Sequence, residues 1–135
     1  MLKLIIGVKG TGKTKTLIGL VNEAVEKSQG AVICIEKGDK LRFDVKYQAR
    51  LIDTNEYFVD DAQALFGFVA GILASNHDVT DLFIDSALKI CQNDAAAFDK
   101  FLDEMNAIVE KLNINVVMTS SLATESASET VKKYL

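Results

Sequence analysis

Residues 2–27 read LKLIIGVKGTGKTKTLIGLVNEAVEK, and this stretch decides the fold. Its first part, Leu2 to Ile6, is a short apolar run typical of a buried strand. From Lys13 to Lys27 the apolar residues recur at steps of three and four, which predicts an amphipathic helix that ends before Gly30. A glycine-rich run, Gly7 to Thr14, lies between them. The sequence therefore predicts a strand that enters a tight loop and continues into a helix.

The loop, GVKGTGKT, fits the pattern G-x-x-x-x-G-K-[ST] at every fixed position, and we call it the P-loop, or Walker A motif. Its glycines let successive backbone N–H groups point at one anion, and the helix that follows adds the positive end of its dipole. Lys13 is expected to bind the β- and γ-phosphates and to act in catalysis, while the Thr14 hydroxyl would ligate magnesium. The residues predicted to hold the phosphates are Gly7, Val8, Lys9, Gly10, Thr11, Gly12, Lys13, Thr14 and Lys15.

A second magnesium ligand is expected at the end of another buried strand. Leu82 to Ile84 is such an apolar run, and it ends on Asp85. Because the carboxyl ends of parallel strands meet at one edge of a sheet, this carboxylate should lie near the P-loop as a Walker B aspartate. The alternative is an aspartate that only caps the next turn.

The remaining pattern completes an alternation of strands and helices. Further buried strands are expected at 31–35 and 114–118, and helices after the N-cap candidates Asp60 and Asp61 and from Asp94. The last dozen residues should form a short helix or a loose tail. Between them, residues 39–57 contain apolar residues that alternate with polar ones from position 41 to position 47, which predicts an edge strand or hairpin.

These residues resemble the RecA-like ATPases, a group of P-loop NTPases. In that group an additional strand lies between the P-loop strand and the Walker B strand, and the chain has one at 31–35. The family's second strand ends in a glutamate that acts on the attacking water, which corresponds to Glu36 here. Asp85-Ser86 is similar to the Walker B end of recombinases in this group. The 114–118 strand leads into Thr119 and Ser120, where the family has a polar residue that senses the γ-phosphate.

The resemblance implies an α/β fold, a single domain over residues 1–135 built as a three-layer α/β/α sandwich. Its mostly parallel sheet would have the strand order 1-4-3-2, with the possible edge strand or hairpin added. ATP and Mg²⁺ are the implied ligands. Glu36 would be the catalytic base, and Thr119 or Ser120 would contact the γ-phosphate. For Glu36 the alternative is a solvated residue at the start of the polar run 36–40.

Three functions are compatible with such a site. The first is Mg-dependent ATP hydrolysis, since the N-K-x-D and D-x-x-G motifs of GTPases are absent. The second is a non-hydrolysing switch or assembly subunit. The helix Ala62 to Ala74, apolar on nearly every face, would then contact another copy or a protein partner, unless the sheet and the tail cover it. The third is a small-molecule kinase, against which two arginines and no obvious lid argue, although residues 39–57 could cover a site.

Composition limits the partners further. The 135 residues suffice for one domain, and the net charge of −4 gives no general attraction to nucleic acid or anionic lipid, so nucleic acid is unsupported. The apolar run at the N-terminus is too short for a signal peptide or a membrane span. Cys34 and Cys91 have no metal-ligand spacing and are expected to be reduced. We therefore predict a cytoplasmic protein that does not enter the membrane.

Overall fold

The computed structural model describes residues 1–135 and contains one sheet of five strands, all parallel. The strands are β1 (Leu2–Gly7), β2 (Ala31–Glu36), β3 (Arg50–Asp53), β4 (Val79–Ile84) and β5 (Asn115–Ser121). The α-helices are α1 (Lys13–Lys27), α2 (Ala62–Ser75), α3 (Ala87–Ile90), α4 (Ala95–Leu112) and α5 (Glu129–Lys132). Three 3₁₀ turns complete the chain, η1 (Lys40–Phe43), η2 (Thr54–Tyr57) and η3 (Thr124–Ser126).

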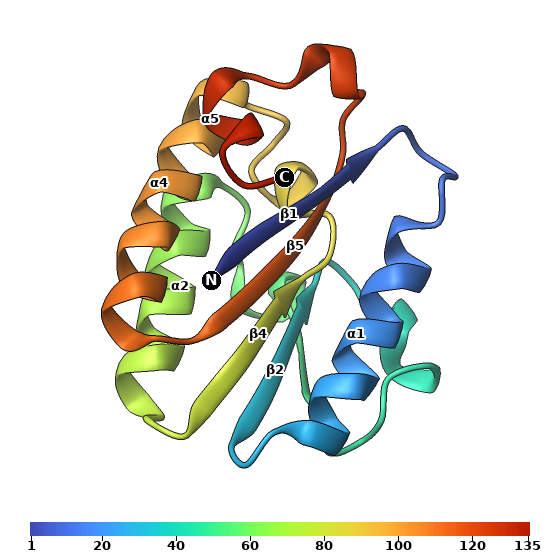
Figure 1. The fold of residues 1–135 in the computed structure, drawn as a ribbon, viewed down its shortest axis with the longest axis vertical. Helices are drawn as coiled ribbons and strands as arrows, with labels where there is room; N and C mark the ends of the chain where they lie inside the picture. Colours follow the sequence, from blue (N-terminus) through green and yellow to red (C-terminus); the bar gives the residue numbers. More distant parts are fainter.

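The sheet order is β1-β5-β4-β2-β3, so β5 lies between the P-loop strand and the strand that precedes Asp85. Helix α1 covers one face of the sheet, and α2 and α4 lie side by side on the other (Figure 1). This arrangement confirms the predicted α/β class and is consistent with three layers. The expected order 1-4-3-2 describes four strands, whereas the sheet has a fifth, the short strand β3, which pairs with the outer side of β2.

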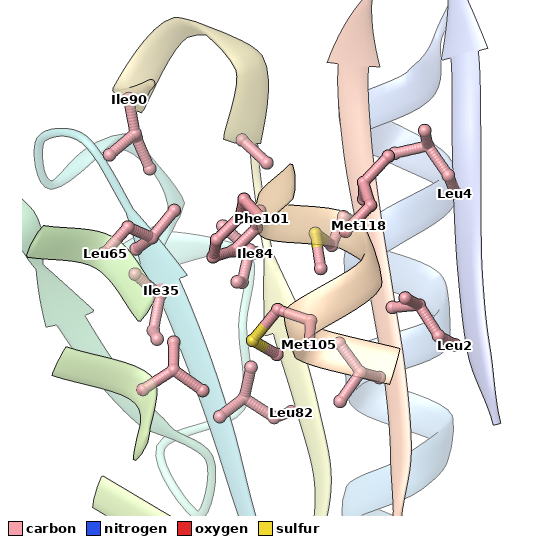
Figure 2. Close-up of a cluster of buried hydrophobic side chains, with 14 of the residues drawn as sticks. Leu2, Leu4, Ile35, Leu65, Leu82, Ile84, Ile90, Phe101, Met105 and Met118 are labelled. Carbon is pink, nitrogen blue, oxygen red and sulfur yellow. The ribbon is translucent and has the colours of Figure 1, made fainter. Parts of the chain in front are cut away.

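Alternation along the strands supplies a core to each face. In β2, Ile33 and Ile35 point toward α2 and α4, whereas Val32 and Cys34 point toward α1. The larger core joins strand residues such as Leu82 to helix residues such as Phe101 and Met105 (Figure 2). Each fully buried side chain of this size contributes about 1.5–3 kcal/mol. The helices therefore hold the sheet firmly, and with it the edge where the strands end.

Local sequence signals set the helix boundaries as predicted. Helix α1 spans the predicted residues, and α2 and α4 begin after Asp61 and Asp94. The Asp61 carboxylate accepts the Ala64 N–H at 2.7 Å, and the Asp94 carboxylate accepts the Ala97 N–H at 3.1 Å. Each aspartate thus satisfies an N–H group that the first turn of a helix leaves without a partner.

The segment 39–57 differs from its predicted structure. Its alternating residues do not form a strand, because residues 40–43 make the turn η1 and the next ones are irregular. Leu41 and Val45 are buried in the core beneath α1, while Phe43 and Tyr47 are exposed. The apolar residues of this segment therefore alternate because the fold buries some of them beneath α1, and not because the segment is a strand. The edge strand is β3, and since it pairs in parallel with β2, the predicted hairpin is wrong.

Helix α2 packs against α4 and belongs to the same core as the strands of the sheet and the tail residues Val131 and Tyr134. Four residues of α2 are buried, Ala62, Leu65, Val69 and Leu73. Phe66 and Phe68 are partly buried against the same core. Neither α2 nor any other helix combines the length and apolar character needed to cross a membrane.

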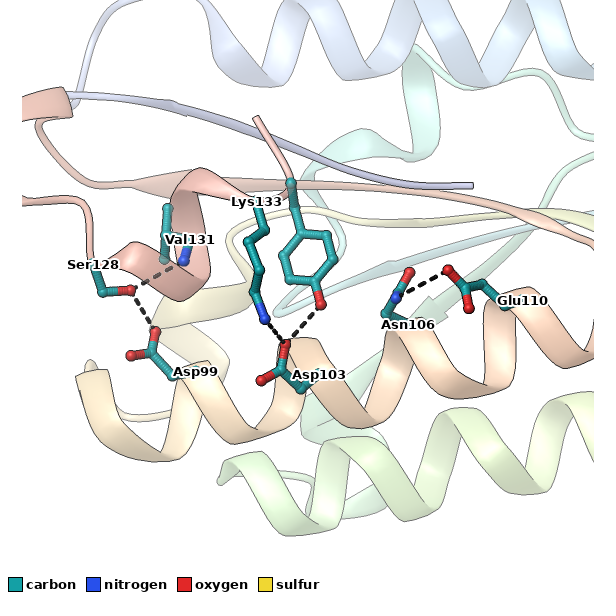
Figure 3. A network of polar contacts seen from close by, with 8 residues as sticks. Asp99, Asp103, Asn106, Glu110, Ser128, Val131 and Lys133 are labelled. Atoms are coloured by element: carbon teal, nitrogen blue, oxygen red, sulfur yellow. Dashed lines mark hydrogen bonds and ion pairs between the residues drawn. The ribbon is translucent and has the colours of Figure 1, made fainter.

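The C-terminal tail is short, helical and firmly attached (Figure 3). The Tyr134 hydroxyl and the Lys133 ammonium donate to one oxygen of Asp103 on α4, at 2.7 and 2.9 Å. The Tyr134 carbonyl also accepts the Leu4 N–H at 2.7 Å, on the side of β1 that faces away from β5. Val131 and Tyr134 are buried. Of the two predictions for the tail, the short helix is confirmed and the loose end is wrong.

Both cysteines are buried and unbridged. Burial raises the pKa of each thiol to about 12. At neutral pH neither thiol therefore supplies the thiolate that cysteine chemistry requires.

Candidate functional site

The P-loop adopts a conformation that depends on its glycines. Gly10 and Gly12 have φ angles of +88° and +83°, in the left-handed region that side chains disfavour. A Cβ atom on Gly7 would lie 2.6 Å from the Thr11 hydroxyl oxygen. The loop joins the end of β1 to the start of α1, so the predicted strand, loop and helix are confirmed.

A cavity of about 570 Å³ opens beside the P-loop, at the carboxyl ends of the strands. It is lined by sixteen residues, of which one, Leu41, is hydrophobic. The predicted site residues that line it are Lys9, Gly10, Gly12, Lys13, Thr14, Lys15, Glu36, Asp85 and Thr119. The fold therefore brings residues from four separate segments of the chain to one cavity. The predicted residues Gly7, Val8 and Thr11 shape the loop but do not line the cavity.

Thr14 and Asp85 meet at the floor of this cavity. The Thr14 hydroxyl lies 3.1 Å from one carboxylate oxygen of Asp85 and 3.3 Å from the other. Thr119 donates to the same carboxylate at 2.7 Å, and the Asp85 backbone N–H donates to Ile35 at 2.8 Å. Asp85 is therefore buried and fixed from both neighbouring strands.

This oxygen pair fits a magnesium ion bound largely through phosphates. Mg²⁺ prefers oxygen ligands and is commonly held by one or two protein groups, with phosphates and water completing its shell. No group of three or more His, Cys, Asp or Glu side chains could hold a metal ion without such help. Thr14 and Asp85 are the residues that would hold the ion.

Glu36 is the last residue of β2 and is buried, so its alternative interpretation as a solvated residue is wrong. Its two carboxylate oxygens accept the backbone N–H groups of Lys40 and Leu41, at 3.1 and 3.0 Å. Burial raises the pKa of Glu36, and the charges of Asp85 and Asp53 raise it further, against the two backbone hydrogen bonds that lower it. The side chain thus lines the cavity while it caps η1.

The two hydroxyl residues predicted at the end of β5 have different positions. Thr119 lines the cavity, and its hydroxyl accepts the Ser86 N–H at 2.8 Å. Ser120 is fully buried, does not line the cavity, and accepts the Leu88 N–H at 3.2 Å. The Ser120 hydroxyl therefore faces α3, so of the two predicted hydroxyl residues only Thr119 lines the cavity. Both residues lie inside β5, which is longer than predicted.

Sequence reasoning missed seven residues of the cavity, which are Lys37, Lys40, Leu41, Ser86, Lys89, Asn93 and Ser121. All but Ser121 follow the ends of β2 and β4, where parallel strands present their loops at the same edge. Their position directly after the ends of these strands was the sequence signal that could have identified them. Six lysines and two carboxylates line the cavity, which gives it a strongly positive character.

No family model matches the chain, and no curated protein matches it.

Proposed function

We propose that this chain binds ATP with Mg²⁺ at the P-loop and hydrolyses it, as a minimal RecA-like ATPase. The observation that carries the proposal is the 3.1 Å contact between the Thr14 hydroxyl and Asp85, beside a loop with the Walker A pattern. These residues are 71 positions apart, so only the fold brings them together. The place of β5 between β1 and β4 agrees with the order expected for the strands β1, β5, β4 and β2 and further supports the proposal.

Each residue has a role that its position supports. The backbone N–H groups of the loop and the start of α1 would hold the phosphates. Lys13 donates to the Val8 carbonyl at 3.0 Å, and a bound phosphate would draw this ammonium group away from the loop. Magnesium would supply positive charge to the phosphate oxygens. Glu36 would take a proton from water once its carboxylate leaves the N–H groups of Lys40 and Leu41.

Calorimetric titration of ATP, ADP and GTP with Mg²⁺ tests binding. We expect Lys13→Ala to weaken ATP binding by about 10- to 100-fold, equivalent to about 1.4–2.8 kcal/mol. Lys111→Ala is the matched control, because it removes the same charge from an exposed position at the end of α4. Equal ATP affinity in wild type and Lys13→Ala would contradict the assignment of the site.

A second candidate is a nucleotide-dependent switch or assembly subunit that does not turn ATP over. It is favoured by the two hydrogen bonds that the Glu36 carboxylate accepts from the Lys40 and Leu41 N–H groups, because they give this side chain a structural role as the cap of η1. Phosphate release in wild type and Glu36→Gln separates the two functions. Slow release that is lost in Glu36→Gln supports hydrolysis, whereas ATP binding without release from wild type supports the switch.

A further inference from the structure

The cavity carries more positive charge than a single nucleotide requires. Six of the fifteen Lys and Arg residues line it, against two of the nineteen Asp and Glu residues. None of these six lysines belongs to an ion pair, although five cations elsewhere in the protein do. Unpaired like charges in one cavity repel one another until an anion binds. The cavity is therefore arranged for a ligand set with a high negative charge.

The six lysines form two groups. Three belong to the P-loop and the start of α1, and these are Lys9, Lys13 and Lys15. The other three come from the segments after β2 and β4, and with a neighbouring amide they form what we call the basic rim: Lys37, Lys40, Lys89 and Asn93. Within the rim, Lys37 has one side-chain partner, the Asn55 carbonyl oxygen at 3.0 Å. The rim thus has free donors apart from those that face the nucleotide phosphates in the proposed function.

The backbone that presents Lys89 and Asn93 is unusual. Ser86, Gln92 and Asn93 have φ angles of +57°, +60° and +55°, and they are three of the five non-glycine residues with positive φ. Costly conformations of this kind persist only where the surroundings hold them, and they concentrate at binding sites. The holding groups are the Thr119 and Ser120 hydroxyls, which accept N–H groups from this segment at 2.8 and 3.2 Å.

We propose that the basic rim is a second anion subsite, which binds the phosphate group of a small phosphorylated molecule beside the nucleotide. The proposal rests on the proposed function, in which the nucleotide phosphates occupy the P-loop. Lysine suits such a group because its ammonium is a compact charge with three donors. The rim lines the same cavity of about 570 Å³ as the P-loop, so the second phosphate would bind next to the nucleotide phosphates.

A nucleic-acid strand fits the rim less well than a small molecule. Outside the cavity the chain has nine cations and seventeen acids. Nucleic-acid sites instead extend positive charge along the protein surface, because each phosphate contact adds to affinity. A surface with such an excess of acids repels a long polyanion, whereas a single phosphate group needs only the cavity.

The test uses the full chain saturated with Mg²⁺ and a non-hydrolysable ATP analogue, AMP-PNP. Inorganic phosphate and glycerol 3-phosphate are then titrated separately by calorimetry, so that free phosphate and a phosphate monoester are distinguished. We expect one equivalent of the monoester to bind. Lys37→Ala and Lys89→Ala, both at exposed positions, should each weaken that binding about tenfold or more and change AMP-PNP affinity less than about threefold. Lys111→Ala is the control and should change neither.

Three results would overturn the subsite. The first is no saturable binding of either probe below about 10 mM. The second is unchanged probe binding in both rim variants. The third is a tenfold loss of AMP-PNP affinity in those variants, which would assign the rim to the nucleotide. Failure of wild type to bind AMP-PNP would instead refute the proposed function, and the same two variants would then test the rim on nucleotide-free protein.

Discussion

Replacement of Thr119 by valine tests how the candidate site is held together. The Thr119 side chain is 1% exposed, and its hydroxyl links two parts of the site. It accepts the Ser86 N–H at 2.8 Å and donates to Asp85 at 2.7 Å. Valine keeps the branched shape of threonine and removes both hydrogen bonds, so packing changes little while the polar link is lost.

The magnitude follows from these two bonds. The Ser86 N–H is partly buried, so its loss of an acceptor should cost about 1 kcal/mol, and a hydrogen bond to a charged carboxylate contributes about 1.5–3 kcal/mol. Together they predict that Thr119→Val lowers the free energy of unfolding by about 2.5–4 kcal/mol. That is a large share of the about 5–15 kcal/mol typical of a native domain. The Ser86 turn should loosen, and ATP affinity in the presence of Mg²⁺ should fall with it.

Urea unfolding of four proteins provides the measurement: wild type, Thr119→Val, Thr119→Ser and Ser121→Ala. Serine keeps the hydroxyl and loses one methyl group, so Thr119→Ser should cost only about 1 kcal/mol. Ser121 also lines the cavity but is exposed, so its substitution by alanine should change stability by less than about 0.5 kcal/mol. If Thr119→Val costs no more than Thr119→Ser, the hydroxyl does not hold the site and the reasoning is refuted.

Three further substitutions address other parts of the protein, each measured by urea unfolding. Because burial raises the pKa of Glu36, the wild type loses stability as pH rises from the ordinary pKa of a glutamate, about 4.3, to the raised one, so Glu36→Gln should gain stability relative to wild type as pH rises above about 4.3. A constant or shrinking difference would contradict this sign. A Cβ at Gly30 would lie 2.1 Å from the Asp78 carbonyl oxygen, so Gly30→Ala should lower the free energy of unfolding by about 1–3 kcal/mol. An unchanged free energy of unfolding would mean that the backbone moves freely there. Tyr134→Phe removes the 2.7 Å hydrogen bond to the half-exposed Asp103 and should cost about 1 kcal/mol. The effect should vanish in an Asp103→Ala background, which has no acceptor for the Tyr134 hydroxyl.

Local signals predicted the parts of the fold that neighbouring residues determine. The glycines of the P-loop fix its turn, and the spacing of apolar residues fixes α1 over Lys13–Lys27. Asp61 and Asp94 mark the starts of α2 and α4 because their carboxylates satisfy N–H groups three residues later. The position of Asp85 could also be predicted, because this residue ends an apolar run that is typical of a buried strand.

Non-local contacts determine the parts that sequence reasoning missed. The alternation from Leu41 to Tyr47 has the period of a strand, but Glu36 folds this segment into η1 by accepting its backbone N–H groups. Side chains that bond nearby backbone in this way compete with regular structure. In the sequence, Lys37 and Lys89 look like ordinary solvated lysines. They share a cavity only because β2 and β4 are neighbours in the sheet, which no local pattern specifies.

The tail bond between Leu4 and Tyr134 has a consequence for assembly. At the margin of the sheet along β1 the tail takes the Leu4 N–H, whereas the outer side of β3 has no strand beside it. Addition of a further strand is therefore opposed at β1 and open at β3. Two copies joined through β3 would be related by a two-fold axis and would leave only the two β1 margins. The hydrogen bond that anchors the C-terminus would thus work against fibres built by continuing this sheet.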